Sequence, residues 1–261
     1  MKENAVNVMR EPADELAVDL GYVKAGQMHF DRTLRELGDD ELRGPSLLPG
    51  WTRAHVVAHV GFNARALGRL VDWATTGIEK PMYESAHARS REIDSAAPLS
   101  KVELRELGDR EARALEIAWS AVPDNRWSTE VNNAQGVRIP VVDTVWMRSR
   151  ELWLHAIDLN YSASAADIPP AVQRRIIHNV LDTWATRDDY RVHMTVADTG
   201  EEFEPASSHI TTADSTTART AVSGSLPNLL MWVTGRRNIA VSAVDTSGRE
   251  IGTAPTAPRW L

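Results

Sequence analysis

The sequence contains no cysteine anywhere in its 261 residues. Disulfide bonds, thiolate metal ligands and nucleophilic or redox chemistry at a protein thiol are therefore excluded. Any sulfur chemistry that this protein carries out must use sulfur that arrives with a ligand.

Long hydrophobic runs and an excess of basic charge are also missing. No segment approaches the ~18 uninterrupted apolar residues of a membrane-spanning helix. The first residues, MKENAVNVMREPADEL, carry charges where a signal peptide needs an apolar core. Lys and Arg number 29 against 36 Asp and Glu, which gives a formal net charge of −7 without a long basic run. We therefore expect a cytoplasmic protein whose partners include neither a membrane nor nucleic acid.

What is present is the composition of a packed globular protein, with 43% hydrophobic and 25% charged residues. Apolar residues recur at spacings of three and four in four segments, which predicts four amphipathic helices. Four helices within about 160 residues are typical of an antiparallel, up-down bundle. The predicted helices cover residues 14–37, 52–77, 100–119 and 140–160.

The ends and connections of these helices also have sequence signals. Thr52 is expected to cap the second helix, and Pro140 is expected at the first position of the fourth, where its missing N–H would be unpaired anyway. Residues 78–98 are polar and lack clean periodicity, so we expect a long connection or a broken helix there. Residues 124–139 are expected to form a loop with a short hairpin around Gly136.

The pattern changes after residue 160. The small, polar segment YSASAADIPP predicts a linker, followed by a helix over residues 171–187 and an alternating strand over 192–196. Two more strands, in ARTAVSG and NIAVSAV, are expected around a helix in SLPNLLMWVTG. We therefore predict an α+β protein with two domains, a four-helix bundle over residues 1–162 and a smaller α+β domain over residues 163–261.

A possible metal site combines the second and fourth helices. Glu151 and His155 are four residues apart, so their side chains can converge on one point of a helix. His59 lies beside the apolar seam of the second helix and can supply a third ligand. Two imidazoles and one carboxylate match the pattern of catalytic zinc, which has three protein ligands and an open position. The same ligands can also hold iron, nickel or manganese.

Other interpretations of these residues remain open at this point. His59 can be an ordinary core histidine, and Glu151 with His155 can be a pair that stabilises a helix by about 0.2–0.5 kcal/mol. His55 is a rival to His59, because it lies four residues before it. His55 also occupies the first turn of its helix, where it can assist capping instead.

Two motifs resemble a known family. GWTRAHVVAHV, followed about ninety residues later by RSRELWLHAIDL, resembles the metal-binding N-terminal domain of mycothiol-dependent maleylpyruvate isomerases, which belong to the DinB-like four-helix bundles. The resemblance covers roughly residues 10–160, and SLPNLLMWVTGRR is similar to the small domain that accompanies it. It implies that His59, Glu151 and His155 are the metal ligands, and that Asp158 supports one of them.

The resemblance also implies an activity. Such an enzyme converts maleylpyruvate to fumarylpyruvate in gentisate-type aromatic catabolism, with mycothiol and a divalent metal, most simply zinc, as cofactors. The thiol adds to the C=C bond, the resulting single bond rotates, and elimination restores the alkene. A free thiol of pKa about 8.5 is only a few per cent ionised at pH 7, whereas a metal-bound thiol is deprotonated.

The dicarboxylate substrate requires local positive charge, for which arginine is the best suited residue. We expect Arg236 and Arg148 to act in the reaction, and Arg89, Arg91 and Arg237 to hold the bound molecules. Each arginine also has a structural interpretation. Arg89 and Arg91 can be solvated charges of a connection, Arg148 can pair with Glu151, and Arg236 and Arg237 can neutralise a helix C-terminus.

Three other functions are compatible with the same metal site. The first is an S-transferase that joins mycothiol to electrophiles, and the second is a non-catalytic module that senses thiols or regulates a partner. The third is a metal hydrolase, which would need a separate general base near the metal. The sequence contains no glutamate in an obvious position for that base.

Overall fold

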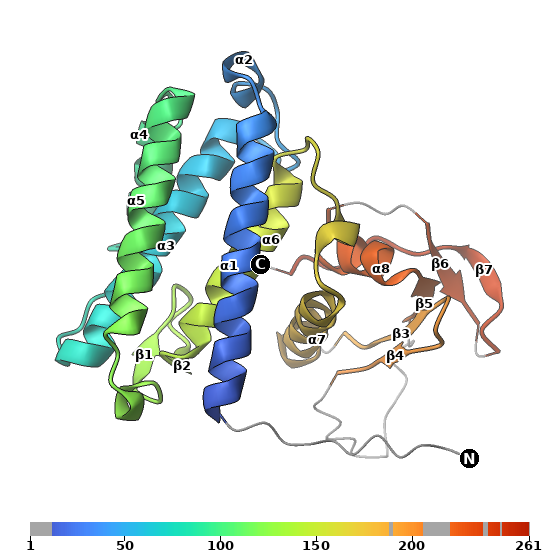
Figure 1. The fold of residues 1–261 in the computed structure, drawn as a ribbon. Coiled ribbons are helices and arrows are strands. Elements are labelled where there is room, and N and C mark those ends of the chain that lie inside the picture. Colours follow the sequence, from blue (N-terminus) through green and yellow to red (C-terminus); the bar gives the residue numbers. More distant parts are fainter. Residues whose placement is uncertain (1–11, 188–189, 206–219, 237–239, 246, 261) are drawn as a thin grey trace. The chain divides into compact units, whose positions relative to one another are not determined.

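The computed structural model describes residues 12–187, 190–205, 220–236, 240–245 and 247–260, and it shows an α+β protein (Figure 1). The chain divides into two compact units, residues 1–163 and 164–261. No helix in the described ranges is long and apolar enough to cross a membrane.

The N-terminal unit is a bundle built from four long helices, α1, α3, α5 and α6 (Figure 1). Helix α3 packs against α5 and α6, and α1 packs against α6. Two short helices, a 3-10 turn and a hairpin complete the unit. Its elements are α1 (Pro12–Glu36), α2 (Asp39–Leu42), α3 (Arg53–Thr76), α4 (Ala86–Ala96), α5 (Lys101–Ser120), η1 (Asp124–Arg126), β1 (Glu130–Asn132), β2 (Arg138–Pro140) and α6 (Asp143–Asp158).

Helix α3 is the centre of this bundle, because most of its residues are buried. The hydroxyl of Thr52 accepts a hydrogen bond from the backbone N–H of His55 and caps its start, and Gly77, with φ of 75°, ends it in the left-handed conformation. Small residues allow close packing on its α5 side. A Cβ at Gly61 would lie 3.3 Å from Cγ of Leu107.

One sequence prediction for this unit needs correction. Pro140 does not begin the fourth helix, because it pairs with Glu130 at the end of the β1–β2 hairpin, and α6 begins only at Asp143. The hairpin itself is confirmed, and Gly136 at its turn is left-handed, with φ of 76°. The polar connection contains a real helix, α4, whose N-cap Ser85 accepts a hydrogen bond from the N–H of Ala88.

The C-terminal unit combines two helices with a five-stranded sheet in the order β4-β3-β5-β6-β7. Strands β3 and β5 are parallel, with Val192 opposite Thr220, and the other neighbours are antiparallel. Helix α8 packs against α7 and the three central strands. The elements are η2 (Ala165–Asp167), α7 (Pro170–Arg187), β3 (Val192–Val196), β4 (Glu202–Phe203), β5 (Thr220–Gly224), α8 (Leu226–Val233), β6 (Val241–Val244) and β7 (Glu250–Thr253).

The helices and three central strands of this unit were predicted from the sequence, whereas β4 and β7 were not. Strand β4 has only two residues, too few to show an alternating pattern. Strand β7 is exposed along its whole length, so neither of its faces carries the apolar signal of a half-buried strand.

Candidate metal centre

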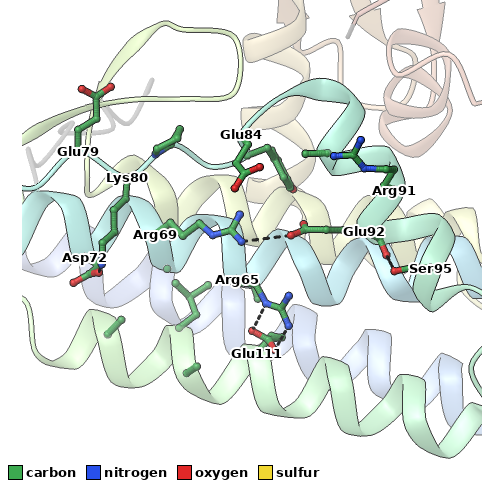
Figure 2. Close-up of a pocket in the computed structure, with 18 residues that line it drawn as sticks. Arg65, Arg69, Asp72, Glu79, Lys80, Glu84, Arg91, Glu92, Ser95 and Glu111 are labelled. Carbon is green, nitrogen blue, oxygen red and sulfur yellow. Dashed lines mark hydrogen bonds and ion pairs between the residues drawn. The ribbon is translucent and has the colours of Figure 1, made fainter.

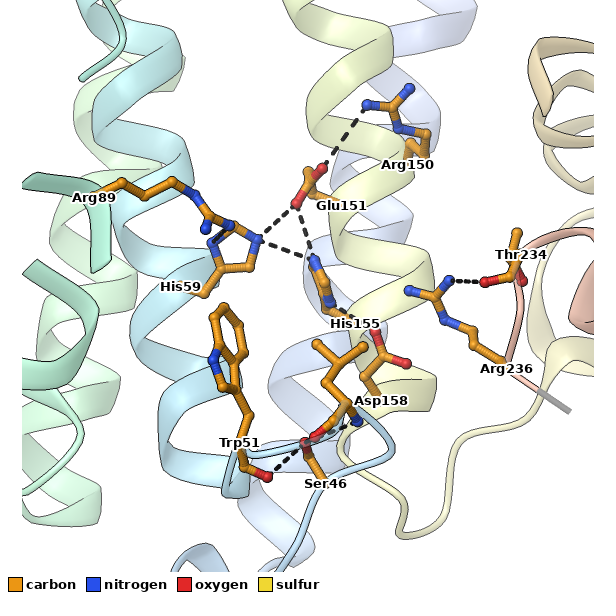
Figure 3. Close-up of polar contacts among 11 residues, drawn as sticks. Ser46, Trp51, His59, Arg89, Arg150, Glu151, His155, Asp158, Thr234 and Arg236 are labelled. Carbon is orange, nitrogen blue, oxygen red and sulfur yellow. Dashed lines mark hydrogen bonds and ion pairs between the residues drawn. The ribbon is translucent and has the colours of Figure 1, made fainter. Parts of the chain in front are cut away.

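The side chains of His59, Glu151 and His155 converge between α3 and α6 (Figure 3). Nε2 of His59 lies 3.0 Å from Oε2 of Glu151 and 3.1 Å from Nε2 of His155. Nε2 of His155 lies 3.0 Å from the same carboxylate oxygen. Within the described ranges, these three residues are the group of His, Asp and Glu side chains whose atoms are close enough to share one metal ion.

The local sequence explains why the three side chains meet. Glu151 and His155 lie one turn apart on α6, so their side chains project from the same face. His59 lies in the first half of α3, on the stretch that packs against α6. The convergence therefore depends on two helices that come together in the fold although 92 residues separate His59 from Glu151.

The donor set fits a metal better than a hydrogen-bonded cluster. A ring N–H points in one direction, so Nε2 of His59 can donate to Glu151 or to His155, but not well to both. The three atoms are 3.0–3.1 Å apart, so a point about 2 Å from each of them lies just outside their plane. That distance matches zinc bonds to nitrogen and oxygen of about 2.0–2.2 Å.

The protonation states also suit a cation. Burial lowers the pKa of the His59 imidazole to about 4, against the opposing effect of Glu151. Burial would raise the pKa of the Glu151 carboxyl, but hydrogen bonds with His155 and His59 outweigh it and hold this pKa well below its usual value. The site therefore presents a neutral imidazole and a carboxylate at neutral pH, both in the form that binds metal.

Asp158 supports the third residue of the cluster. Its Oδ2 lies 2.8 Å from Nδ1 of His155, and its side chain is fully buried. Burial disfavours the charged form of His155, but the hydrogen bonds with Asp158 and Glu151 prevail and raise the pKa of this imidazole. The expected contact between Asp158 and a member of the triad is thus present. It favours the tautomer of His155 that keeps Nε2 free for a metal.

Arg89 is the predicted arginine that contacts the triad. From α4, its guanidinium nitrogen lies 3.3 Å from Nδ1 of His59 (Figure 3). The guanidinium carbon lies 5.9 Å from the ring centroid of Trp51 and 5.8 Å from that of Tyr83. Trp51 in turn lies edge-on to His59, with 5.5 Å between ring centroids. A cation held between two aromatic rings therefore borders the cluster on its α3–α4 side.

Arg148 was expected to act in the reaction or to pair with Glu151, and the structure places it in the bundle interior. Only 1% of it is exposed, and its guanidinium donates hydrogen bonds to the carbonyl of Val60, the side chain of Asn63 and the side chain of Gln27. Burial lowers the pKa of Arg148 to about 10. These bonds use neutral acceptors on α1 and α3, so Arg148 connects helices in the bundle interior and does not form an ion pair with Glu151.

Two of the remaining predicted arginines, Arg91 and Arg236, lie within the described ranges. Arg91 is exposed on α4 and lines a cleft between α3, α4 and α5. Arg236 follows α8 in the C-terminal unit, where its guanidinium donates to the carbonyl of Thr234. Arg237 lies outside the described residues.

His55 has the structural role that was the alternative to metal binding. It is the third residue of α3, and its Nδ1 lies 3.2 Å from the backbone N–H and 2.6 Å from the hydroxyl of Thr52. His55 and Thr52 thus form a reciprocal cap. This contact keeps His55 at the helix start and leaves His59, one turn later, as the histidine that faces α6.

Two aromatic neighbours of the cluster, Trp51 and Tyr83, were not predicted as site residues. Trp51 directly precedes the cap of α3 within the GWTRAH motif, so its closeness to His59 could have been suspected from that motif. Tyr83 lies in the polar connection before α4, where no periodicity indicates which way its side chain points. Only the folded structure brings it beside Arg89.

Known proteins resemble this chain in sequence and in fold. The sequence profile of the mycothiol maleylpyruvate isomerase N-terminal domain matches residues 23–160. Two crystal structures, of a mycothiol-dependent maleylpyruvate isomerase and of a histidine-to-alanine mutant of it, each match with a TM-score of 0.83 and 34% sequence identity. Each match covers 94% of this chain and 97% of the other. No curated protein sequence matches significantly.

Proposed function

This chain belongs to the mycothiol-dependent maleylpyruvate isomerase family, and from this premise we propose that it converts maleylpyruvate to fumarylpyruvate with mycothiol and a divalent metal. The observation that carries the proposal is the triangle of His59, Glu151 and His155, whose three metal-binding atoms lie 3.0–3.1 Å apart. Nitrogen and oxygen ligands in this number are typical of catalytic zinc, which we propose as the metal.

We assign the three residues of the triangle as the metal ligands. Glu151 supplies one negative charge and the two histidines supply none, so a bound divalent ion keeps a net positive charge that attracts an anionic sulfur. When bound, the metal and the thiol cofactor together supply a thiolate that adds reversibly to the substrate C=C bond and allows it to rotate. The residues of the chain hold and orient the reactants around this chemistry.

Asp158 and Arg89 have supporting roles in this proposal. Asp158 accepts the Nδ1 hydrogen of His155 and fixes the direction in which its Nε2 points. Arg89 holds its guanidinium within 3.3 Å of the triad, where it can bind a carboxylate of the substrate or the enolate oxygen that carries negative charge after thiolate addition. Arg236 remains a proposed second contact for the substrate.

The proposal is tested by metal analysis combined with an absorbance assay on maleylpyruvate. We expect one zinc ion per chain and conversion to fumarylpyruvate only when both the metal and mycothiol are present. Free thiol should be measured in the same reaction, because isomerisation regenerates the thiol whereas an S-transferase consumes it. Turnover without mycothiol, or by protein stripped of metal, would contradict the proposal.

A further inference from the structure

A charged cleft lies beside the triad within the N-terminal unit, and no step proposed above uses it. It has a volume of about 940 Å³ and is lined by α3, by the 79–84 segment, by α4 and by α5 (Figure 2). This volume is within the range of about 300–1,000 Å³ that small-molecule sites occupy. Its lining includes small residues, namely Ala64, Gly68, Ala114 and Ala118.

The walls of the cleft are almost entirely ionic. Four cations and five carboxylates line it, so the lining is close to neutral with a slight negative excess. The cations are Arg65, Arg69, Lys80 and Arg91, and the carboxylates are Asp72, Glu79, Glu84, Glu92 and Glu111. Arg65 is held on Glu111 by two hydrogen bonds of 2.8 and 3.1 Å. Arg69 donates to the carbonyl of Met82 at 2.6 Å and lies 3.4 Å from Glu92.

This charge pattern discriminates between ligands. A dianion such as a dicarboxylate would meet more carboxylates than cations, and Arg65 and Arg69 are already paired. Sugar hydroxyls suit the cleft better, because each can donate to a carboxylate and accept from a guanidinium. Glu84 and Arg91, which have no polar side-chain partner in the described part of the chain, supply one free acceptor and one free donor group.

The cleft does not include the triad, but Tyr83 and Arg89 connect the two. Tyr83 lines it and packs beside the guanidinium of Arg89, at 5.8 Å from carbon to ring centroid. Arg89 then contacts His59. One tyrosine and one arginine therefore lie between the cleft and a proposed metal ligand. A molecule with a polyhydroxylated part joined to a thiol could occupy the cleft and extend its sulfur toward the metal.

We propose that the cleft between α3, α4 and α5 binds the neutral, polyhydroxylated sugar portion of the thiol cofactor, with Tyr83 in its lining and Arg89 between Tyr83 and the triad. This inference rests on the proposed function, because it takes mycothiol as the cofactor. It also assigns the two reactants to different places, since the anionic substrate binds at Arg89 beside the triad and the uncharged sugars bind in the cleft.

Gly68 offers a direct way to fill the cleft. It lies within α3, and a Cβ built there meets no heavy atom within 4 Å. A Gly68→Leu side chain would therefore extend into the open cleft without a clash, and leucine has the higher helix propensity. Gly21 in α1 is a matched control, because it is also helical, also has open space around its added Cβ, and does not line the cleft.

The experiment measures calorimetric binding of S-methyl mycothiol to the zinc-loaded protein, because this thioether cannot form a thiolate. We expect Gly68→Leu to weaken its binding at least tenfold, and Gly21→Leu to bind as the unchanged protein does. In the isomerase assay, the KM for mycothiol should rise in Gly68→Leu, while the KM for maleylpyruvate changes less than twofold. Equal binding of S-methyl mycothiol by Gly68→Leu and the unchanged protein would overturn the inference.

A second pair of variants tests the cleft independently, in case Gly68→Leu does not fold. Glu84→Ala removes an exposed carboxylate of the cleft, and Glu106→Ala removes an exposed carboxylate of α5 outside it. Only Glu84→Ala should weaken binding of S-methyl mycothiol, and equal binding by both would count against the cleft. Failure of the proposed function would give a different result from failure of this inference. In that case the unchanged protein would bind S-methyl mycothiol but would not isomerise maleylpyruvate.

Discussion

His155 and Asp158 form a hydrogen bond of 2.8 Å between Nδ1 and Oδ2, three residues apart on α6, while the other ring nitrogen of His155 faces Glu151. The carboxylate of Asp158 is fully buried. A buried negative charge at this place orients the imidazole and increases its basicity, which strengthens its bond to a metal.

We therefore expect Asp158→Asn to lower zinc affinity by about 10–100-fold, because such partners of a metal-binding histidine have effects of this size. Affinity would be measured by competition with a chromogenic chelator. Asp94→Asn is the control, since Asp94 is 67% exposed and lies 3.9 Å from His55, away from the triad. Zinc affinity within twofold of the unchanged protein would show that Asp158 does not support the ligand.

Replacing His59 by alanine should abolish zinc retention and mycothiol-dependent turnover together, since two ligands hold the ion much less well than three. The helical circular dichroism spectrum should persist, because α3 remains packed through its apolar residues. Metal content after gel filtration is the measurement, and His87→Ala on the exposed side of α4 is the matched control. Stoichiometric zinc in His59→Ala would remove His59 from the ligand set.

Zinc affinity should depend on pH through a single proton. The pKa of His155 is raised, so below that pKa a proton must leave His155 before zinc binds. His59, with a pKa of about 4, and Glu151, with a pKa well below its usual value, are already deprotonated near neutrality. Affinity should therefore rise about tenfold per pH unit up to the pKa of His155 and level off above it.

Chelator competition between about pH 5.5 and 8.5 would measure this dependence. The control is Asp158→Asn, in which loss of the carboxylate removes one cause of the raised pKa and should move the bend of the curve to lower pH. A slope corresponding to two protons per zinc across this range would mean that His59 also titrates there.

Arg148→Met should destabilise the protein without removing its metal. The substitution leaves the carbonyl of Val60 and the side chains of Asn63 and Gln27 without their donor. Loss of a buried partner costs about 1–3 kcal/mol, which urea denaturation of the metal-free protein would detect. Arg113→Met, at an exposed position of α5, should change stability by less than about 0.5 kcal/mol. Normal stability with lost turnover would instead return Arg148 to a role in the reaction.

Arg89→Met should raise the KM for maleylpyruvate by about 10–100-fold, which corresponds to the loss of a charge-assisted contact of about 1.5–3 kcal/mol. Zinc content should stay at one per chain, because Arg89 is not a ligand. Arg236→Ala tests the second proposed substrate contact in the same assay, with reduced turnover or substrate affinity expected at full zinc content. Wild-type kinetics in either variant would exclude that arginine from substrate binding.

Much of the fold and of the candidate site could be predicted from local patterns. The spacing of four between Glu151 and His155 becomes a shared helix face as soon as α6 forms, and the apolar periodicity of α3 indicates the side on which His59 lies. Helix α4 could not be predicted in this way. Only two of its residues, Ile93 and Ala96, are buried, so it lacks a clear apolar periodicity. Pro140 was misplaced because the same residue type suits both a helix start and the end of a short strand.

The sequence by itself determined which side chains are available for the site: no thiol, two imidazoles and a carboxylate, with Glu151 and His155 at helical spacing. It also contains the motifs that indicate the family. Only the tertiary structure decided which of them meet. His59 faces α6, while His55 caps its own helix. Arg148 forms hydrogen bonds in the bundle interior, and Arg89 contacts the triad from α4. The physical reason is that local spacing sets the direction of a side chain along its own helix, whereas its partners depend on how separate helices pack.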